Sequence, residues 1–159
     1  MPVPYRERYL EDFPVGEVVE FGDYLVTEEE IVSFAKAYDP QSFHTDPVAA
    51  RTSSFGGLVA SGWMTGAILI RLMVDHFIPH TALGSPGVDH VRWGRPVRPD
   101  DRLRARATVV EARRSRRRPD RGVVVLRQEA LNQRGEIVMS MDATILFRCR
   151  RDRGREGHE

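Results

Sequence analysis

The sequence predicts an α+β domain in which one curved antiparallel sheet wraps around a single long helix. The order of the elements is the first reason, because a short strand and a short helix precede one long apolar helix, and only strands follow it. The second reason is the long helix itself, expected over residues 57–76, where apolar side chains occupy nearly every face. A helix of that kind is buried on all sides, as it would be inside a wrapped sheet.

The segment before the long helix is expected to hold a strand over residues 21–26 and a helix from Thr27 to about residue 37. Thr27 and Glu30 fit a capping box, in which two side chains satisfy the free amides at a helix start. The helix should end at Asp39, because a residue that precedes proline avoids the helical conformation.

Beyond Asp39, residues 40–46 are expected to form a loop, since they contain two turn-forming residues and no helical periodicity. Residues 47–51 predict a single helical turn, and Asp46 is expected to cap it.

The second half of the chain predicts four strands with apolar residues at alternate positions. They are expected at residues 88–93, 102–111, 123–131 and 137–147. The 159 residues are enough for one domain with a core, so we expect a single domain over 1–159, with its core at about 9–148. The polar residues 152–159 predict a disordered tail.

Bulk composition favours a soluble globular protein, with 41% hydrophobic and 30% charged residues. The single Cys149 excludes an internal disulfide and fits a reducing compartment. Residues 1–12 lack the apolar region of a secretory signal. The apolar stretch 57–78 contains Arg71 and Asp75, which argues against a membrane span. We therefore expect a cytoplasmic protein without a membrane partner.

Charge is distributed unevenly along the chain. Residues 1–80 hold 5 basic and 12 acidic side chains, a balance of −7, whereas residues 81–159 hold 19 and 11, a balance of +8. Such an asymmetry can mark a site for an anionic ligand. Five of the six residues 113–118 are arginines, but no aromatic residues for base stacking are interleaved with them. A solvated hairpin tip is the simpler interpretation, and no nucleic-acid partner is expected.

Residues 37–47 read A-Y-D-P-Q-S-F-H-T-D-P and carry the strongest candidate for chemistry. Asp39 and His44 are five residues apart, a spacing that would not place both side chains on one face of a regular helix or strand. Loops held by a rigid scaffold often carry function. A carboxylate and an imidazole that grip one water can exchange protons near neutral pH. The alternative is structural, with Asp39 as a helix-ending turn residue and His44 as a bonded core histidine.

With this loop and the helix after it, the sequence resembles the MaoC-like dehydratase family, which includes the R-specific enoyl-CoA hydratases. That family carries Asp-x-Asn-Pro-x-His-x-Asp, matched here by Asp39, His44 and Asp46, and then a Gly-rich start to the central helix of a hot-dog fold, matched by residues 56–62. The resemblance covers about residues 9–148. It departs from the pattern at Gln41, where asparagine is usual, and in the position of the proline.

The resemblance implies roles for individual residues. Asp39 and His44 would share the catalytic water. The amides of Gly56, Gly57 and Leu58, at the expected start of the central helix, would form an oxyanion hole. Ser61 would position the pair or the thioester. Phosphates of coenzyme A would meet Arg92 and Arg95, in competition with Arg98 and with the arginines of residues 113–118.

The implied function is that of a hydro-lyase in fatty acid metabolism, adding water reversibly and R-selectively to a 2-enoyl-CoA. Coenzyme A is then part of the substrate, and no separate cofactor is expected. The five histidines form no helical His-x-x-x-His motif, so no metal is expected. A homodimer or a higher homo-oligomer is expected. Two alternatives stay open: a hot-dog acyl-CoA thioesterase, and a non-catalytic acyl-CoA-binding protein.

Overall fold

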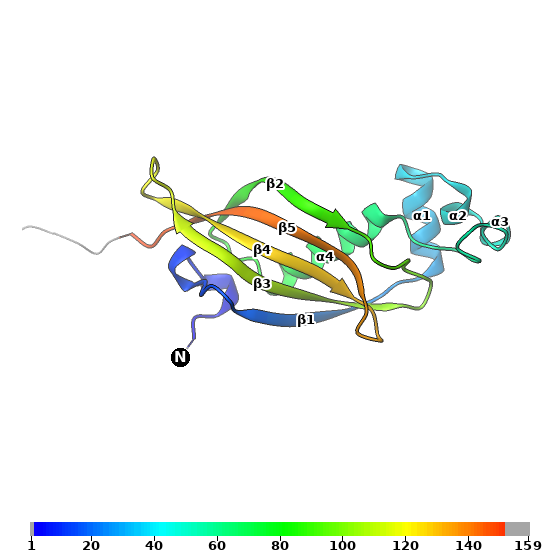
Figure 1. Cartoon of the computed structure of the whole chain (residues 1–159), viewed down its shortest axis with the longest axis horizontal. Helices are drawn as coiled ribbons and strands as arrows, with labels where there is room; N and C mark the ends of the chain where they lie inside the picture. Colours follow the sequence, from blue (N-terminus) through cyan, green and yellow to red (C-terminus); the bar gives the residue numbers. More distant parts are fainter. Residues whose placement is uncertain (1, 152–159) are drawn as a thin grey trace, which may run out of the picture.

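A computed structural model describes residues 2–151 of the chain, so the predicted tail at 152–159 lies outside the described residues. One five-stranded antiparallel sheet, in the order β1-β3-β4-β5-β2, curves around one long helix, α4 (Figure 1). This confirms the predicted α+β hot-dog architecture. The helices and strands are β1 Val18–Leu25, α1 Glu28–Tyr38, α2 Ser42–Thr45, α3 Pro47–Ala50, α4 Gly62–His76, β2 Ala82–Arg92, β3 Arg102–Arg114, β4 Arg121–Leu131 and β5 Ile137–Arg148.

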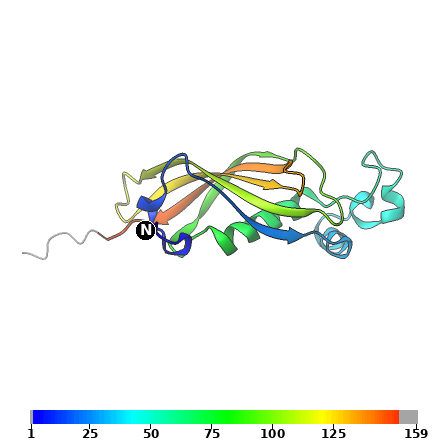
Figure 2. The same ribbon diagram turned by 90° about the horizontal axis from the view of Figure 1, so that it is seen from below.

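The core lies between the concave face of the sheet and α4, as Figure 2 shows from below. Alternation along β3 buries Leu103, Ala105, Ala107 and Val109 almost completely, while the arginines between them face outward. Successive strand residues point to opposite faces, so this pattern places one row of side chains against the helix. The alternation predicted from the sequence for β3 is therefore confirmed.

The helix α4 differs from its prediction in two respects. It begins at Gly62, not Gly57, and Ser61 is its N-cap, accepting a hydrogen bond from the Trp63 amide at 3.3 Å. It is also not covered on every side. Trp63, Ile70 and Val74 are 65%, 45% and 51% exposed. Together with exposed Ala67 they form a row at helical spacing, here called the exposed α4 stripe.

The segment that leads to the site is built by local capping. Thr27 caps α1, since its hydroxyl oxygen accepts from the Glu30 amide at 3.2 Å. The Glu30 carboxylate instead accepts from the Tyr24 hydroxyl, so only half of the predicted capping box forms. Asp46 caps α3 as predicted, accepting from the amides of Val48 and Ala49. The loop prediction was wrong for residues 42–45, which form the one-turn helix α2.

Candidate active site

A cavity of about 380 Å³ opens where α1, α2, the start of α4 and the segment after β2 meet. Much of its wall is aromatic, from Phe43, Phe55, Trp63 and Trp93. Four polar or charged side chains also line it: Asp39, His44, Thr65 and Arg95. Cavities of this composition are typical of small-molecule sites.

Three polar side chains converge on the carboxylate of Asp39, the residue that ends α1. Its Oδ1 accepts a hydrogen bond from Gln41 Nε2 at 2.7 Å. Its Oδ2 accepts one from Ser61 Oγ, also at 2.7 Å, and lies 3.3 Å from Nε2 of His44. The loop and the start of the central helix therefore meet at this carboxylate.

These contacts stabilise the ionised form of Asp39. The hydrogen bond from Gln41, then that from Ser61, and then the nearby His44 lower the pKa of Asp39 below its ordinary value of 3.8, against partial burial that raises it. The sequence indicated Gln41 only as a departure from the family pattern. The only sequence signal for the hydrogen bond between Gln41 and Asp39 was a side-chain amide two residues after the aspartate.

His44 is buried, with 6% of its surface exposed, and its two ring nitrogens face different partners. Its Nδ1 lies 2.6 Å from the carbonyl oxygen of Val59. A carbonyl can only accept, so Nδ1 carries a hydrogen. Nε2, which faces Asp39, is left as the nitrogen that can gain or lose a proton inside the cavity.

The prediction for Gly56, Gly57 and Leu58 rested on a helix start that the structure places elsewhere. None of the three lines the cavity, and α4 begins four residues after Leu58. The first backbone amide of α4 belongs to Gly62, and Gly62 does line the cavity. Within residues 2–151 that amide donates to no other group. An anion in the cavity would meet this free donor and the positive end of the helix dipole.

Trp93 lies directly against the start of α4. Its Nε1 donates to the carbonyl of Gly62 at 2.9 Å, and a Cβ on Gly62 would come within 2.6 Å of the indole. Trp63 packs edge-on against Trp93, with ring centroids 5.1 Å apart. Gly62 therefore has no room for a side chain, and Trp93 closes one wall beside its free amide.

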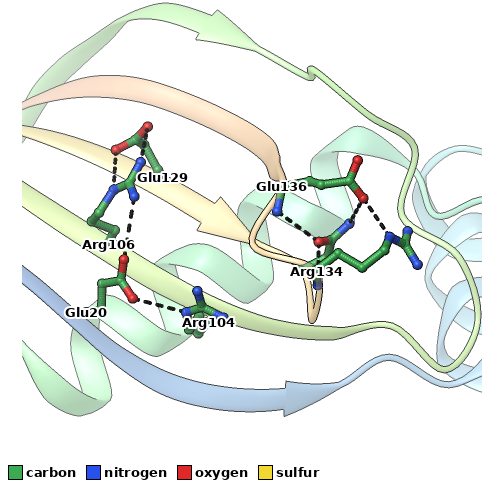
Figure 3. A network of polar contacts seen from close by, with 7 residues as sticks. Glu20, Arg104, Arg106, Glu129, Arg134 and Glu136 are labelled. Carbon is green, nitrogen blue, oxygen red and sulfur yellow. Dashed lines mark hydrogen bonds and ion pairs between the residues drawn. The ribbon is translucent and has the colours of Figure 1, made fainter.

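Of the arginines predicted to meet coenzyme A, only Arg95 lines the cavity. It pairs at 2.7 Å with Glu136, in the turn after β4, and Glu136 also binds Arg134 (Figure 3). Two guanidinium groups thus share the Glu136 carboxylate, and the charge of Asp101 also acts on Arg134. Arg92 donates to the Val91 carbonyl and Arg98 to that of Phe55.

Other candidate sites can be reported briefly. Within residues 2–151, no group of three or more His, Cys, Asp or Glu side chains is arranged to hold a metal. His90 on β2 lies 3.1 Å from Asp142 on the neighbouring strand β5, and that carboxylate also binds Arg127. None of the helices in the same residues is both long enough and apolar enough to cross a membrane.

Comparison with known proteins agrees with this architecture. The family model of the MaoC-like domain matches residues 12–132. The crystal structure of a MaoC-like dehydratase from Rhodospirillum rubrum is 40% identical, with a TM-score of 0.85 over 91% of this chain and 99% of that one. The chain therefore belongs to the MaoC-like dehydratase family.

Two curated relatives carry names that describe an activity. A 3-hydroxyacyl-thioester dehydratase Z from Mycobacterium tuberculosis is 36% identical over 99 residues, which cover 60% of this chain and 66% of that protein. A mesaconyl-CoA hydratase from Cereibacter sphaeroides is 38% identical over 152 residues, which cover 90% of this chain but 42% of that protein. This chain thus spans less than two thirds of each of these two relatives.

Removing the Gln41 amide is expected to raise the pKa of Asp39 toward its ordinary value. Gln41 is exposed and its side-chain amide binds Asp39, so Gln41→Met removes the largest cause of the lowering at little risk to folding. The Asp39 carboxyl signal, followed by NMR with labelled aspartate, should then titrate at higher pH than in the wild type. Ser42→Ala, at the exposed first residue of α2, serves as the control. An unchanged Asp39 titration in Gln41→Met would contradict the assigned cause.

Proposed function

We propose that this protein is a hydro-lyase that adds water reversibly, and R-selectively, to a 2-enoyl-CoA or a similar acyl thioester. The observation that carries the proposal is the pairing of an ionised Asp39 with His44 Nε2, 3.3 Å apart, in a cavity whose wall includes Gly62, the first residue of α4. Membership in the MaoC-like dehydratase family and the names of the two curated relatives support it.

Hydration needs a base, an acid and a site for negative charge. Asp39 and His44 would hold one water between them. As the water oxygen bonds to C3 of the double bond, its proton passes to this pair, and the pair delivers a proton to C2. One H₂O is added overall, and both side chains return to their starting protonation. The Gly62 amide would stabilise the negative charge that develops on the thioester oxygen.

Arg95 is proposed to contact a phosphate of coenzyme A, because a guanidinium binds phosphate oxygens well. The aromatic walls would hold the acyl chain. Arg92 is also proposed as a phosphate contact, although it is exposed and lies outside the cavity wall.

A thioesterase would use the same groups but would attack the carbonyl carbon instead of C3. Reaction in ¹⁸O-labelled water separates the two. Hydration places the label on the C3 hydroxyl of an intact CoA ester, which mass spectrometry of the product would show. Label in a released carboxylate would overturn the proposal in favour of a thioesterase, and no incorporation with any enoyl-CoA would favour a non-catalytic binding protein.

We also propose that the chain forms a homodimer through β2 and the exposed α4 stripe. β2 is an edge strand with a largely exposed surface, and the stripe presents Trp63, Ile70 and Val74 to solvent next to Trp93, which follows β2. A contiguous apolar surface on a soluble protein commonly marks an interface. Pro86 cannot donate a hydrogen bond, so packing of the stripe would have to supplement any pairing of β2.

Ile70→Glu is expected to convert the dimer to a monomer, because the interface would have to bury an unpaired carboxylate. Light scattering after gel filtration should give twice the 18.1 kDa chain mass for the wild type and a single chain mass for the variant. Arg71→Glu, one residue along the helix and 71% exposed at its side chain, is the control and should remain dimeric. A wild-type monomer, or a dimeric Ile70→Glu variant, would refute this interface.

A further inference from the structure

The turn between β3 and β4 holds three arginines without acidic partners. Residues 113–118 are here called the arginine hairpin. Three of its side chains are exposed and form no ion pair with any residue in 2–151: Arg116, Arg117 and Arg118. Ser115 Oγ accepts hydrogen bonds from the amides of Arg117 and Arg118 at 3.3 and 3.1 Å, which closes the turn. Three guanidinium groups without ion-pair partners thus lie at the tip of the hairpin, and the charge of Arg118 helps to lower the pKa of nearby Asp120.

Positive charge continues beside the arginine hairpin. A cavity of about 620 Å³ at this end of the molecule is lined by Arg148, Arg150 and Arg151, together with Asp120, Tyr9 and Cys149. Of these arginines, Arg150 is bound to Asp12. Clustered like charges repel one another, so an anion that binds here gains from several guanidinium groups at once.

The arginine hairpin is too far from the catalytic cavity of its own chain to assist it. The two lie at opposite ends of the sheet (Figure 1). β4 runs the 11 residues from Arg121 to Leu131, which at about 3.3 Å per residue is about 35 Å. Glu136 follows β4 and pairs with Arg95 in the cavity wall. The length of the strand exceeds that of an extended coenzyme A.

A two-fold symmetric dimer through β2 would bring these two ends together. β2 begins with Ala82 opposite Phe147, at the hairpin end, and ends with Arg92 opposite Ser140, at the cavity end. When two copies of β2 lie antiparallel, the hairpin end of each chain therefore lies beside the cavity end of its partner. In Figure 1 this corresponds to a half-turn about the middle of β2, in the plane of the view.

We propose that the arginine hairpin of one chain binds phosphate groups of the coenzyme A whose acyl end occupies the partner's cavity. The proposal rests on the hydratase and the dimer proposed above. In an acyl-CoA the phosphates lie far from the thioester, so phosphate groups that Arg95 does not reach can be bound by side chains well away from Asp39. Planar guanidinium groups bind phosphate oxygens in pairs, which suits arginine to this role.

The phosphate contact can be tested without turnover. Calorimetry would compare the binding of free coenzyme A to the wild type and to the Arg116→Gln, Arg117→Gln, Arg118→Gln triple variant, with pantetheine as the probe that lacks phosphate. We expect the variant to bind coenzyme A about tenfold more weakly, or ~1.4 kcal/mol, and pantetheine equally. Equal affinity for coenzyme A would overturn the proposal. A wild type that binds coenzyme A through the hairpin but hydrates nothing would contradict the proposed function alone.

Mixed dimers, purified through two different tags, decide which chain supplies the arginines. The first dimer carries Asp39→Asn on one chain and the triple variant on the other. The second carries both changes on one chain beside a wild-type chain. Both have the same composition and one functional cavity. Binding across the interface predicts a normal KM in the first and a KM raised about tenfold in the second. The reverse result, or equal KM values, would overturn binding across the interface.

Discussion

Replacing Asp39 with asparagine is expected to lower kcat/KM for enoyl-CoA hydration by about 10²–10⁴-fold, the usual contribution of a positioned acid or base. Asparagine has nearly the same shape but cannot take up a proton from the water. It also removes the charge that the Gln41 and Ser61 hydrogen bonds stabilise. Initial rates at substrate concentrations below KM measure this loss directly.

Two controls make the Asp39→Asn result specific. His44→Ala removes the other half of the pair and should lower the rate to a similar extent. Ser42→Ala alters an exposed residue at the start of α2 and should change the rate less than about twofold, as is usual for surface substitutions. If Asp39→Asn kept more than a tenth of the activity while folded, Asp39 would not be the catalytic carboxylate.

Gly122→Ala is expected to produce the largest loss of stability from a single methyl group. Gly122 is buried in β4, and a Cβ there would lie 2.3 Å from the Arg113 carbonyl oxygen, 2.4 Å from a Leu10 methyl and 3.0 Å from Arg114 Cα. Two of these neighbours are backbone atoms, which cannot rotate away. Overpacking of this kind costs about 3 kcal/mol, so the urea midpoint should fall clearly below that of the wild type.

The matched control for Gly122 is Gly57→Ala, outside the sheet and outside the proposed interface. A Cβ built at Gly57 meets only the end of the Arg98 side chain at 3.4 Å, so the free energy of unfolding should change by less than about 1 kcal/mol. If both variants unfolded at the same urea concentration, the close packing of Leu10 against the β3–β4 hairpin would be contradicted.

Much of the fold could be predicted from the sequence because local physical rules and the final structure agree. Alternating apolar residues in β3 and β5 set which face meets the helix, and the hydroxyl of Thr27 and the carboxylate of Asp46 cap the helices that follow them. The Asp39–His44 spacing likewise predicted two side chains that the structure brings together.

The start of α4 could not be predicted because distant partners set it. Val59 donates to the Phe43 carbonyl and Ala60 to that of Val97, so this stretch is extended and the helix cannot begin before Ser61. The small residues in the segment 56–62 are compatible with both a helical and an extended backbone. Those tertiary hydrogen bonds also explain why the amide beside the cavity belongs to Gly62 and not to the earlier glycines.

The exposed α4 stripe shows a second limit of sequence patterns. An apolar side chain on a helix can be covered by its own sheet or by a second chain, and composition does not distinguish the two. Leu69 and Met73 face the sheet, whereas Ile70 and Val74 do not. Only the position of the sheet relative to α4 separates these two sets.

The central claim is that the Asp39–His44 cavity hydrates a thioester without cleaving it. Its most direct measurement follows the absorbance of the conjugated enoyl thioester, with crotonyl-CoA and longer enoyl-CoAs, while free thiol is recorded in the same wells. The account predicts loss of absorbance without thiol release in the wild type, and neither change in Asp39→Asn. Thiol release by the wild type, or an unchanged rate in Asp39→Asn, would contradict it.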